Sequence, residues 1–278
     1  MKKINRRSFL AAAGLTAAAL ALTACGGSAS STASSTASSA ASSEAASTSA
    51  AAELTTVEAG KLTMATNAAF PPYEMTTDAG EFEGIDIDTA KAIAEKLGLE
   101  LQIDDMDFDA ALLSVQQGKA DIVMAGVTVT DERKAVMDFS DSYATGIQSI
   151  IVPESSDIAS PDDLAGKKIG TQRGTTGYIY CSDDFGDDAV VAYDNGLTAV
   201  QALNNGQVDA VVIDNAPAKE YVAANPGLTI LDTSYAEEDY AIGMAKGSSL
   251  EAAVNAALEE LKADGTLQAI VDKYITAE

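Results

Sequence analysis

The stretch SVQQGKADIV at residues 114–123 returns in similar form at residues 202–211 as ALNNGQVDAV. Each stretch is typical of a helix end, a glycine that stops the helix, two further residues, an aspartate and an apolar strand. A second pair of similar stretches, residues 61–70 and 168–177, precedes them in the same order, and each is typical of a strand that runs into a polar loop. Two matches in the same order predict that the folded part of the chain contains two similar α/β halves.

The first of these halves alternates strand patterns with helix patterns. Apolar runs predict strands at 61–66, 99–103 and 121–125, and apolar residues at helical spacing predict helices at 85–97 and 108–117. This alternation favours an α/β fold with a largely parallel sheet, because parallel neighbours need a crossover helix between them.

The last segment of the chain has the pattern of two helices. Leu250, Val254, Leu258 and Leu261 form an apolar stripe, Gly265 stops this helix, and a final helix follows from Thr266. Ser248 and Glu251 predict a capping box at the start of the first helix. The spacing of these helices does not complete the second half. A return to cover the first half accounts for them, and it requires the chain to cross twice between the halves.

The composition excludes several classes of function. The 278 residues include 17 basic and 42 acidic side chains, and the net charge of −25 argues against nucleic acid, whose phosphates demand a basic face. The chain has no histidine, which removes the Ser–His–Asp and Cys–His catalytic arrangements and most zinc sites. Two cysteines are too few to hold zinc alone. Hydrophobic residues make up 47% of the chain, enough for one large core or two small ones.

Residues 1–24 have the features of an export signal. Four basic residues precede an apolar run that begins at Phe9 and is too short for a confident transmembrane helix. The run ends in Leu22-Thr23-Ala24-Cys25, which resembles the bacterial lipobox, so we predict a lipoprotein signal peptide at 1–24 and lipid attachment at Cys25. The segment from Arg6 also resembles a twin-arginine signal, and the general secretory route is equally compatible with it.

Residues 25–53 are dominated by serine, alanine and threonine and contain no large apolar residue. Such a segment cannot offset its ordering entropy by burial, so we predict a flexible tether there. Cys181 is then the one thiol of the folded region, and we predict that it is a small buried hydrophobe rather than a disulfide partner of Cys25.

Loops that follow the predicted strands are the places to look for a ligand site, because ligands of open α/β sheets bind beyond the carboxyl ends of the strands. These loops lie at 67–73, 126–133, 172–177 and 214–215. Together they offer the guanidinium of Arg133, the carboxylate of Asp214, several hydroxyls, backbone amides beside glycines and an aromatic ring. This set suits a zwitterionic amino acid, since a carboxylate needs a forked cation with N–H donors and an ammonium needs a buried anion.

Structural roles also fit these residues. Arg133 is compatible with a solvated helix position, Asp214 with a helix cap, 174–177 with a turn and an N-cap, and Phe70 and Phe108 with core positions. The segment 174–177 lacks the lysine and the spacing of a phosphate-binding loop, which argues against nucleotide hydrolysis. The acidic run from Asp104 to Asp109 lacks the spacing of a calcium loop and is typical of a solvated helix N-terminus.

From about residue 61 to 275 the chain resembles the family 3 solute-binding proteins, the amino-acid receptors of ABC importers. The matching stretches lie, in order, at 65–74, 84–88, 126–133, 138–140, 163–167, 174–177 and 265–267. The resemblance implies the α/β type II periplasmic-binding-protein fold, with two lobes joined by two crossover strands near 143–148 and 237–242. Lobe 1 is then expected at 54–145 plus 240–278, and lobe 2 at 146–239.

The resemblance also assigns roles to ten residues of this chain. Arg133 falls where the family grips the ligand α-carboxylate, assisted by Gly126 and Thr128 and, from the other lobe, by Thr175 and Thr176. Asp214 falls on the aspartate that receives the α-ammonium, and Phe70 and Phe108 fall where the ligand side chain is often sandwiched. Asn67 and Gln172 fall at positions that contact the side chain, and Asn67 stands where receptors for basic amino acids often carry an acid. We therefore expect a neutral polar, glutamine-like ligand in preference to a cationic one.

The function implied by the resemblance is that of an exported amino-acid receptor, lipid-anchored to the outer face of the cytoplasmic membrane, that serves an ABC permease. We expect a monomer without cofactor, metal or nucleic acid, and no enzymatic activity. One alternative is a dehydratase of the prephenate or arogenate type on the same scaffold, with Asp214 or Glu74 as proton donor. A second alternative is a ligand-sensing surface protein, which the sequence does not separate from an importer receptor.

Overall fold

Residues 54–275 are described by the structure, a computed structural model. The predicted signal peptide at 1–24, the predicted lipid attachment at Cys25 and the predicted tether at 25–53 lie outside the described residues.

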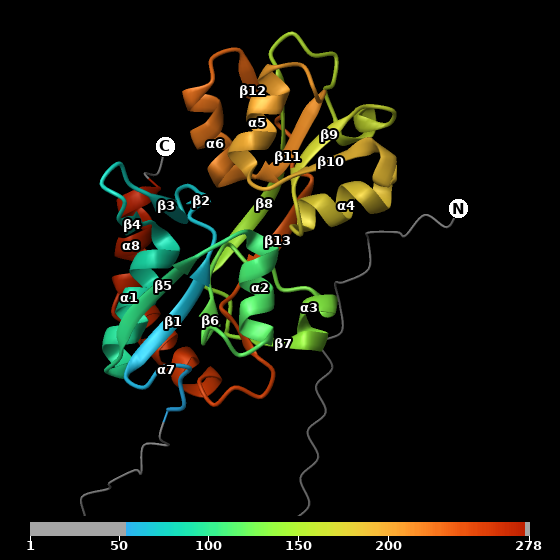
Figure 1. The fold of residues 1–278 in the computed structure, drawn as a ribbon. Coiled ribbons are helices and arrows are strands. Elements are labelled where there is room, and N and C mark those ends of the chain that lie inside the picture. Colours follow the sequence, from blue (N-terminus) through green and yellow to red (C-terminus); the bar gives the residue numbers. More distant parts are fainter. Residues whose placement is uncertain (1–53, 276–278) are drawn as a thin grey trace, which may run out of the picture. The chain divides into compact units, whose positions relative to one another are not determined.

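The first sheet contains five strands in the order β5-β1-β6-β14-β7 (Figure 1). Their bounds are β1 Lys61–Thr66, β5 Glu100–Asp105, β6 Ile122–Val123, β7 Met137–Phe139 and β14 Gly243–Ala245. β1 is parallel to β5 and β6, and α1 (Ile85–Leu97) and α2 (Phe108–Gln116) supply the crossovers. β14 is antiparallel to β6 and β7 because it comes back from the second sheet. The sheet is therefore mixed, and the prediction of a largely parallel sheet holds only for β1, β5 and β6.

The second sheet has the order β10-β9-β11-β8-β12, with β13 paired to β8. Its strands are β8 Ala144–Pro153, β9 Ile169–Gln172, β10 Val190–Tyr193, β11 Ala210–Asp214, β12 Leu228–Ile230 and β13 Ala236–Tyr240, and its helices are α4 Thr176–Phe185, α5 Gly196–Asn204 and α6 Asn215–Ala224. β9 is parallel to β10 and β11, and β8 is antiparallel to β11, β12 and β13. The parallel core thus repeats that of the first sheet.

Short elements complete the described chain. A small antiparallel sheet is formed by β2 Ala69–Phe70, β3 Glu74–Thr76 and β4 Phe82–Glu83; α3 spans Asp131–Val136, and 3₁₀ turns lie at Pro161–Leu164 and Asp187–Ala189. The small sheet and α3 both matter for the site, because they carry residues of the loops that follow β1 and β6.

The predicted repeat corresponds to α2 and β6 in the first sheet and to α5 and β11 in the second. Its aspartates have matching roles. Asp121 accepts a hydrogen bond from the Thr63 N–H of β1 at 2.7 Å, and Asp209 accepts one from the Lys168 N–H just before β9, also at 2.7 Å. Each aspartate therefore ties the start of its own strand to the parallel neighbour, which is the physical reason for the similar sequence.

Two strands carry the chain between the sheets. β8 leaves the first sheet after β7, and β13 lies antiparallel to it, with Glu238 opposite Gly146 (Figure 1). Gly146 has no room for a side chain, since a Cβ there would lie 2.5 Å from the Tyr240 ring. The predicted crossover segments at 143–148 and 237–242 fall on this paired ribbon.

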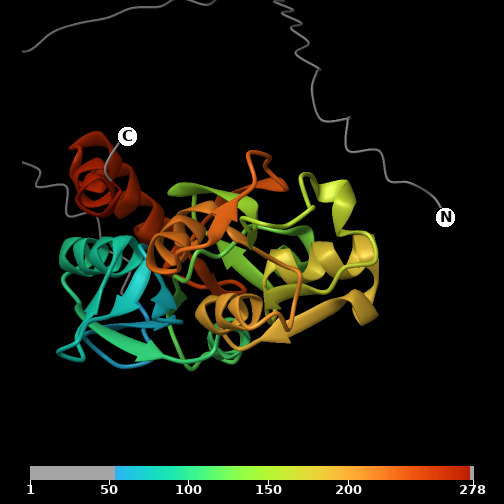
Figure 2. The same cartoon turned by 90° about the horizontal axis from the view of Figure 1, so that it is seen from above.

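The C-terminal helices α7 (Glu251–Ala263) and α8 (Thr266–Tyr274) pack against α1 (Figure 2), so their predicted return to the first half is confirmed. The capping box predicted for α7 is wrong. The helix begins at Glu251, and Ser248 instead accepts a hydrogen bond from the Leu250 N–H at 3.2 Å, because a turn precedes the helix.

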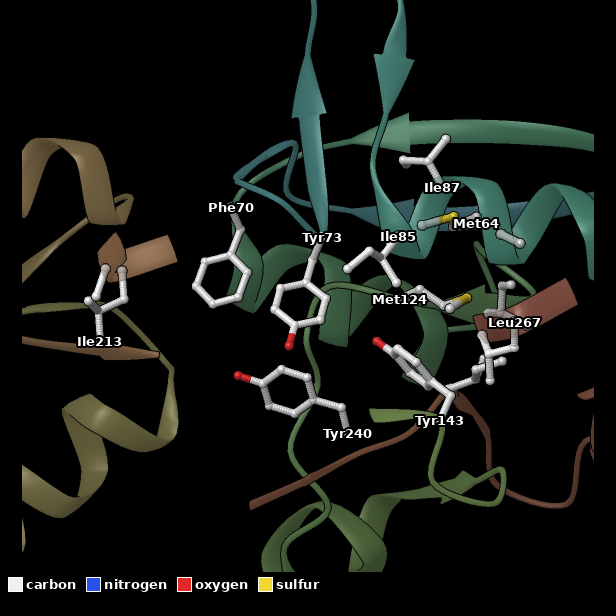
Figure 3. Close-up of a cluster of buried hydrophobic side chains, with 14 of the residues drawn as sticks. Met64, Phe70, Tyr73, Ile85, Ile87, Met124, Tyr143, Ile213, Tyr240 and Leu267 are labelled. Carbon is white, nitrogen blue, oxygen red and sulfur yellow. The ribbon is translucent and has the colours of Figure 1, made fainter. Parts of the chain in front are cut away.

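One cluster of the apolar core includes Phe70, Tyr73, Tyr143 and Tyr240 (Figure 3). Phe70 stacks on Tyr73 with ring centroids 5.8 Å apart, and Tyr73 meets Tyr240 edge to face at 5.4 Å. Cys181 is fully buried in a separate cluster of the second sheet, as predicted. Within residues 54–275, no helix is both long enough and apolar enough to cross a bilayer.

Candidate functional site

One pocket lies where the strand ends of the two sheets face each other. It is lined by Asn67, Phe70, Glu74, Phe108, Ala125, Gly126, Thr128, Arg133, Gln148, Gln172, Thr175, Thr176, Ile213, Asp214 and Tyr240. All ten residues singled out from the sequence are among them. The structure therefore brings together residues that lie up to 147 positions apart in the chain, from Asn67 to Asp214.

Arg133 supplies the positive charge of the pocket. It sits on α3, whose N-cap residue Thr130 accepts the Arg133 N–H at 3.1 Å. The guanidinium is buried and donates to the carbonyls of Thr128 at 2.8 Å and Gly174 at 3.1 Å, with the Phe108 ring 5.4 Å away. Burial lowers the pKa of Arg133, and the charge of Glu238 opposes that shift.

The ion pairs within residues 54–275 do not include Arg133. Its hydrogen-bond partners are neutral carbonyls, so the guanidinium contacts no carboxylate within these residues, and Glu238 acts on it only through its charge. A buried cation in this state favours the arrival of an anion, and a planar guanidinium suits a carboxylate.

Two backbone N–H groups, those of Thr128 and Thr176, belong to pocket residues on the Arg133 side. Thr128 pairs with Tyr240 in an isolated antiparallel β-bridge. The backbone hydrogen bonds of this bridge are made by the two neighbours of Thr128, through the Val129 N–H and the Val127 carbonyl. The N–H and C=O of Thr128 therefore point to the other side, and its carbonyl accepts from Arg133. Thr176 is the first residue of α4, so its N–H has no acceptor within the helix.

The hydroxyls of the three threonines are already engaged within the protein. Thr175 is the N-cap of α4: its hydroxyl accepts the Tyr178 N–H at 3.3 Å and donates to the Gln172 carbonyl at 2.8 Å. The hydroxyls of Thr128 and Thr176 donate to the Glu238 carboxylate. The N–H of Gly126 is also engaged, since it donates to Asp86 at 3.0 Å.

Asp214 supplies the negative charge of the pocket. It ends β11 and caps α6, accepting the Ala216 N–H at 3.0 Å on one oxygen and the Ile147 N–H at 2.8 Å on the other. Asp214 therefore both caps α6 and lines the pocket, two roles that the sequence analysis treated as alternatives. The side chain is 2% exposed, and burial raises its pKa to about 6 against the lowering effect of these N–H donors and of the Tyr240 hydroxyl.

Asn67 and Gln172 meet across the pocket. The Gln172 amide donates to the Asn67 side-chain oxygen at 2.9 Å, and Asn67 donates in turn to the Met106 carbonyl at 2.9 Å. The Gln172 side-chain oxygen has no hydrogen-bond partner within the described residues and is buried. One acceptor thus stays open at this end of the pocket.

Glu74 is a pocket residue that the ligand prediction missed. It is fully buried, no N–H or hydroxyl group within residues 54–275 donates to its carboxyl oxygens, and its side-chain interaction is with another acid, Asp86. Burial, followed by the charge of Asp86, raises the pKa of Glu74 well above its ordinary value and favours the uncharged acid. Burial also raises the pKa of Asp86 to about 6, against the opposing hydrogen bonds from Gly126 and Tyr143.

The remaining pocket residues missed from the sequence are Ala125, Gln148, Ile213 and Tyr240. Gln148 and Tyr240 belong to the β8–β13 ribbon, and Ala125 and Ile213 lie beside predicted loop residues. The sequence did contain one indication of these pocket residues, because Gln148 is a polar residue inside an apolar strand. Within the described residues, no cluster of acidic or thiol side chains is arranged to hold a metal ion.

The chain belongs to the bacterial extracellular solute-binding proteins, family 3, whose model matches residues 62–277. Solved structures of amino-acid-binding members share its architecture, so the fold is the type II periplasmic-binding-protein fold expected from the resemblance.

Three relatives illustrate the range of similar proteins. A probable histidine-binding protein of Neisseria gonorrhoeae is 33% identical, with 99% of this chain and 98% of the relative covered. The ABC transporter glutamine-binding protein GlnH of Bacillus subtilis is 34% identical over 71% of this chain and 74% of its own. The structure of an ancestral arginine-binding protein bound to glutamine is 43% identical, with a TM-score of 0.75, and covers 79% of this chain and all of its own. These relatives are named as binding proteins rather than enzymes.

Proposed function

We propose that this chain is an amino-acid receptor of an ABC importer and that the ten predicted residues contact the ligand. The observation that carries the proposal is the burial of Arg133 and Asp214 in one pocket. Opposite charges at two sides of a closed pocket complement the carboxylate and ammonium of a free amino acid. The amides of Thr128 and Thr176 complete the carboxylate side.

The ligand is held between two lobes, 54–145 plus 240–278 and 146–239, that close around it. Arg133 comes from one lobe, and Asp214 and the Thr176 amide come from the other. The full set of contacts exists only when the lobes are closed, so the ligand stabilises the closed form by its differential affinity. A permease would then receive the ligand from the closed receptor.

A neutral polar side chain, glutamine-like, is the first choice of ligand. Asn67 and Gln172 present amide groups at the side-chain end, and protonated Glu74 adds an uncharged carboxyl. Phe70 and Phe108 supply the apolar walls. The relatives that bind glutamine support this choice.

A cationic side chain is the second choice, and Glu74 is the reason. Glu74 is fully buried beside the pocket, where its carboxyl faces another acid, Asp86, and no donor within residues 54–275 satisfies it. A guanidinium placed there would ionise the carboxyl and form a charge-assisted pair. The arginine-binding relative at 43% identity supports this alternative.

Calorimetry at pH 7.5 with L-glutamine and L-arginine separates these choices. Titration in two buffers of different ionisation enthalpy counts the protons released on binding. Glutamine is expected to release almost none, and arginine about one, a release that Glu74→Gln abolishes. If none of the twenty amino acids raised the melting temperature of the protein in a thermal-shift screen, the receptor function itself would be refuted.

The location and the absence of catalysis complete the proposal. We place the protein outside the cytoplasmic membrane, anchored by lipid on Cys25; mass spectrometry of the membrane fraction is expected to show acylation that Cys25→Ala removes. A soluble, unacylated wild-type protein would contradict the anchor. Incubation with prephenate or arogenate is expected to give no product, and product formation would favour the dehydratase alternative.

A further inference from the structure

Glu238 is a buried carboxylate on β13 that joins groups from both sheets. One of its oxygens, Oε2, accepts three hydrogen bonds: from the Thr128 hydroxyl at 3.1 Å, the Thr176 hydroxyl at 3.0 Å and the Gln148 side-chain amide at 3.0 Å. The side chain is 6% exposed, and its other oxygen, Oε1, has no partner within residues 54–275. All of its donors therefore converge on a single atom.

These donors come from different parts of the fold. Thr128 follows β6 of the first sheet, Thr176 begins α4 on the second sheet, and Gln148 lies on the connecting strand β8. The two hydroxyl oxygens are 3.4 Å apart. A single carboxylate oxygen thus bridges the two sheets immediately beside the Arg133 side of the pocket.

Each threonine hydroxyl can donate only one hydrogen bond. A threonine hydroxyl has one proton, so a hydroxyl that donates to Glu238 has only lone pairs left for other partners. Lone pairs repel an incoming carboxylate. The donors left for the ligand are the Arg133 guanidinium and the N–H groups of Thr128 and Thr176.

We propose that Glu238 is a positioning residue of the amino-acid site, which fixes the Thr128 and Thr176 hydroxyls and so holds the two lobes together around the donors. The inference rests on the proposed function for the identity of the ligand, and on the hydrogen bonds alone for the bridge. Loss of Glu238 would leave the Thr128 and Thr176 hydroxyls with only their direct 3.4 Å contact and would shift the protein toward an open form.

Hydrogen exchange of the ligand-free, full-length protein tests the bridge without any ligand. In Glu238→Ala, peptides covering 126–134 and 172–180 are expected to exchange about tenfold faster, because local opening becomes easier. Peptides covering β1 and β9 are expected to keep the wild-type rate. Glu238→Gln retains an acceptor oxygen and is expected to stay within about threefold of wild type.

Glu237→Ala is the matched control, because Glu237 is an exposed acid on the same strand. It removes the same charge and is expected to leave every peptide unchanged. Wild-type exchange around the pocket in Glu238→Ala would overturn the proposal, and so would equal acceleration of all peptides, which would assign Glu238 to the general stability of the fold.

The second test is a double-mutant cycle that combines Glu238→Ala with Thr176→Val. Calorimetry measures the affinity of each protein for L-glutamine and L-arginine. Glu238→Ala is expected to weaken binding about tenfold, and Thr176→Val about fivefold in the wild type but less than twofold in the Glu238→Ala protein. Additive effects, or tighter binding by Glu238→Ala, would contradict the proposal. If the wild type bound neither amino acid, the proposed function would fail while the exchange experiment still decided the role of Glu238.

Discussion

The two repeated units of this molecule share one design and end in opposite charges. In each, a helix, a glycine turn and an aspartate lead into a buried strand, β6 or β11. After β6 the chain makes a loop and enters α3, which places the cation Arg133; β11 ends directly in the anion Asp214. The shared unit thus builds the scaffold, and in the proposed receptor the charged residue at or beyond each strand end selects the ligand group, carboxylate or ammonium, that each half would bind.

Removing the cation is expected to have the largest effect on this pairing of charges. Arg133→Ala should weaken amino-acid binding by about 2–5 kcal/mol, or about 30-fold to several-thousand-fold, because the ligand carboxylate would be buried without a counter-ion. Calorimetry measures the loss. Arg173→Ala is the matched control, since Arg173 is exposed and its guanidinium donates to the Ala192 carbonyl at 3.4 Å. Equal affinities for wild type and Arg133→Ala would disprove the assigned role.

Replacing Asp214 with a neutral side chain of the same shape is expected to reduce affinity less than the loss of Arg133. Asp214→Asn should weaken binding about 10- to 100-fold, because the ammonium loses a charged partner but keeps a polar one. The protein should fold normally, since asparagine is a good N-cap for α6. Asp188→Asn serves as the control, because Asp188 is an exposed acid in the 3₁₀ turn Asp187–Ala189. A melting temperature unchanged together with wild-type affinity would remove Asp214 from the site.

The pH dependence of binding follows from the raised pKa of Asp214, about 6 in the ligand-free protein. The ammonium needs the ionised carboxylate, so below pH 6 a proton must leave on binding and affinity should fall about tenfold per pH unit. Stability of the ligand-free protein should run the other way. Because the folded pKa exceeds the unfolded value of about 4, this group destabilises the fold as pH rises from about 4 to 6.

Asp214→Asn provides the control for both profiles. Its affinity should vary less with pH than that of the wild type, and the rise in its unfolding free energy on acidification should be smaller. Asp86, whose pKa is also about 6, remains in this variant and accounts for part of any residual slope. An identical pH profile in the two proteins would contradict the assignment to Asp214.

The smallest effect is expected where the ligand side chain would bind, because there the two halves contribute the amides of Asn67 and Gln172 rather than charged groups. Asn67→Asp keeps an acceptor for Gln172 but adds a negative charge, so it should shift the affinity ratio toward L-arginine over L-glutamine by about tenfold. Competition calorimetry with the two amino acids measures the ratio. An unchanged ratio would place the ligand side chain away from Asn67.

Much of the fold was predictable from local patterns. The strand at Lys61–Thr66 and the helix at Ile85–Leu97 match the predictions, since a short buried run in the first and helical spacing with a glycine stop in the second are encoded locally. β6 is shorter than predicted, at Ile122–Val123, because only these residues pair with neighbours on both sides. The antiparallel entry of β14 was not predictable from periodicity, because it depends on how the chain returns from the second sheet.

The candidate site divides in the same way. Asp214 is the last residue of β11, and Arg133 lies on α3 after the loop that follows β6, so the strand-end rule finds both. Glu238 and Gln148 lie within strands, where alternation predicts burial but gives no partner. Only the pairing of β13 with β8 and the approach of Thr128 and Thr176 bring their side chains together. Likewise, the resemblance to the family assigned three threonines to the site, but it did not indicate that the hydroxyls of Thr128 and Thr176 donate to Glu238.

The central claim is that a free amino acid is bound at both of its backbone charges by groups from opposite halves of the protein. A crystal structure obtained with saturating L-glutamine, and with L-arginine in parallel, tests it most directly. We expect the ligand α-carboxylate within roughly 2.7–3.2 Å of the Arg133 guanidinium and of the Thr128 and Thr176 N–H groups, and the ammonium at a similar distance from Asp214. A ligand bound elsewhere, or with Arg133 and Asp214 both turned to solvent, would contradict the claim.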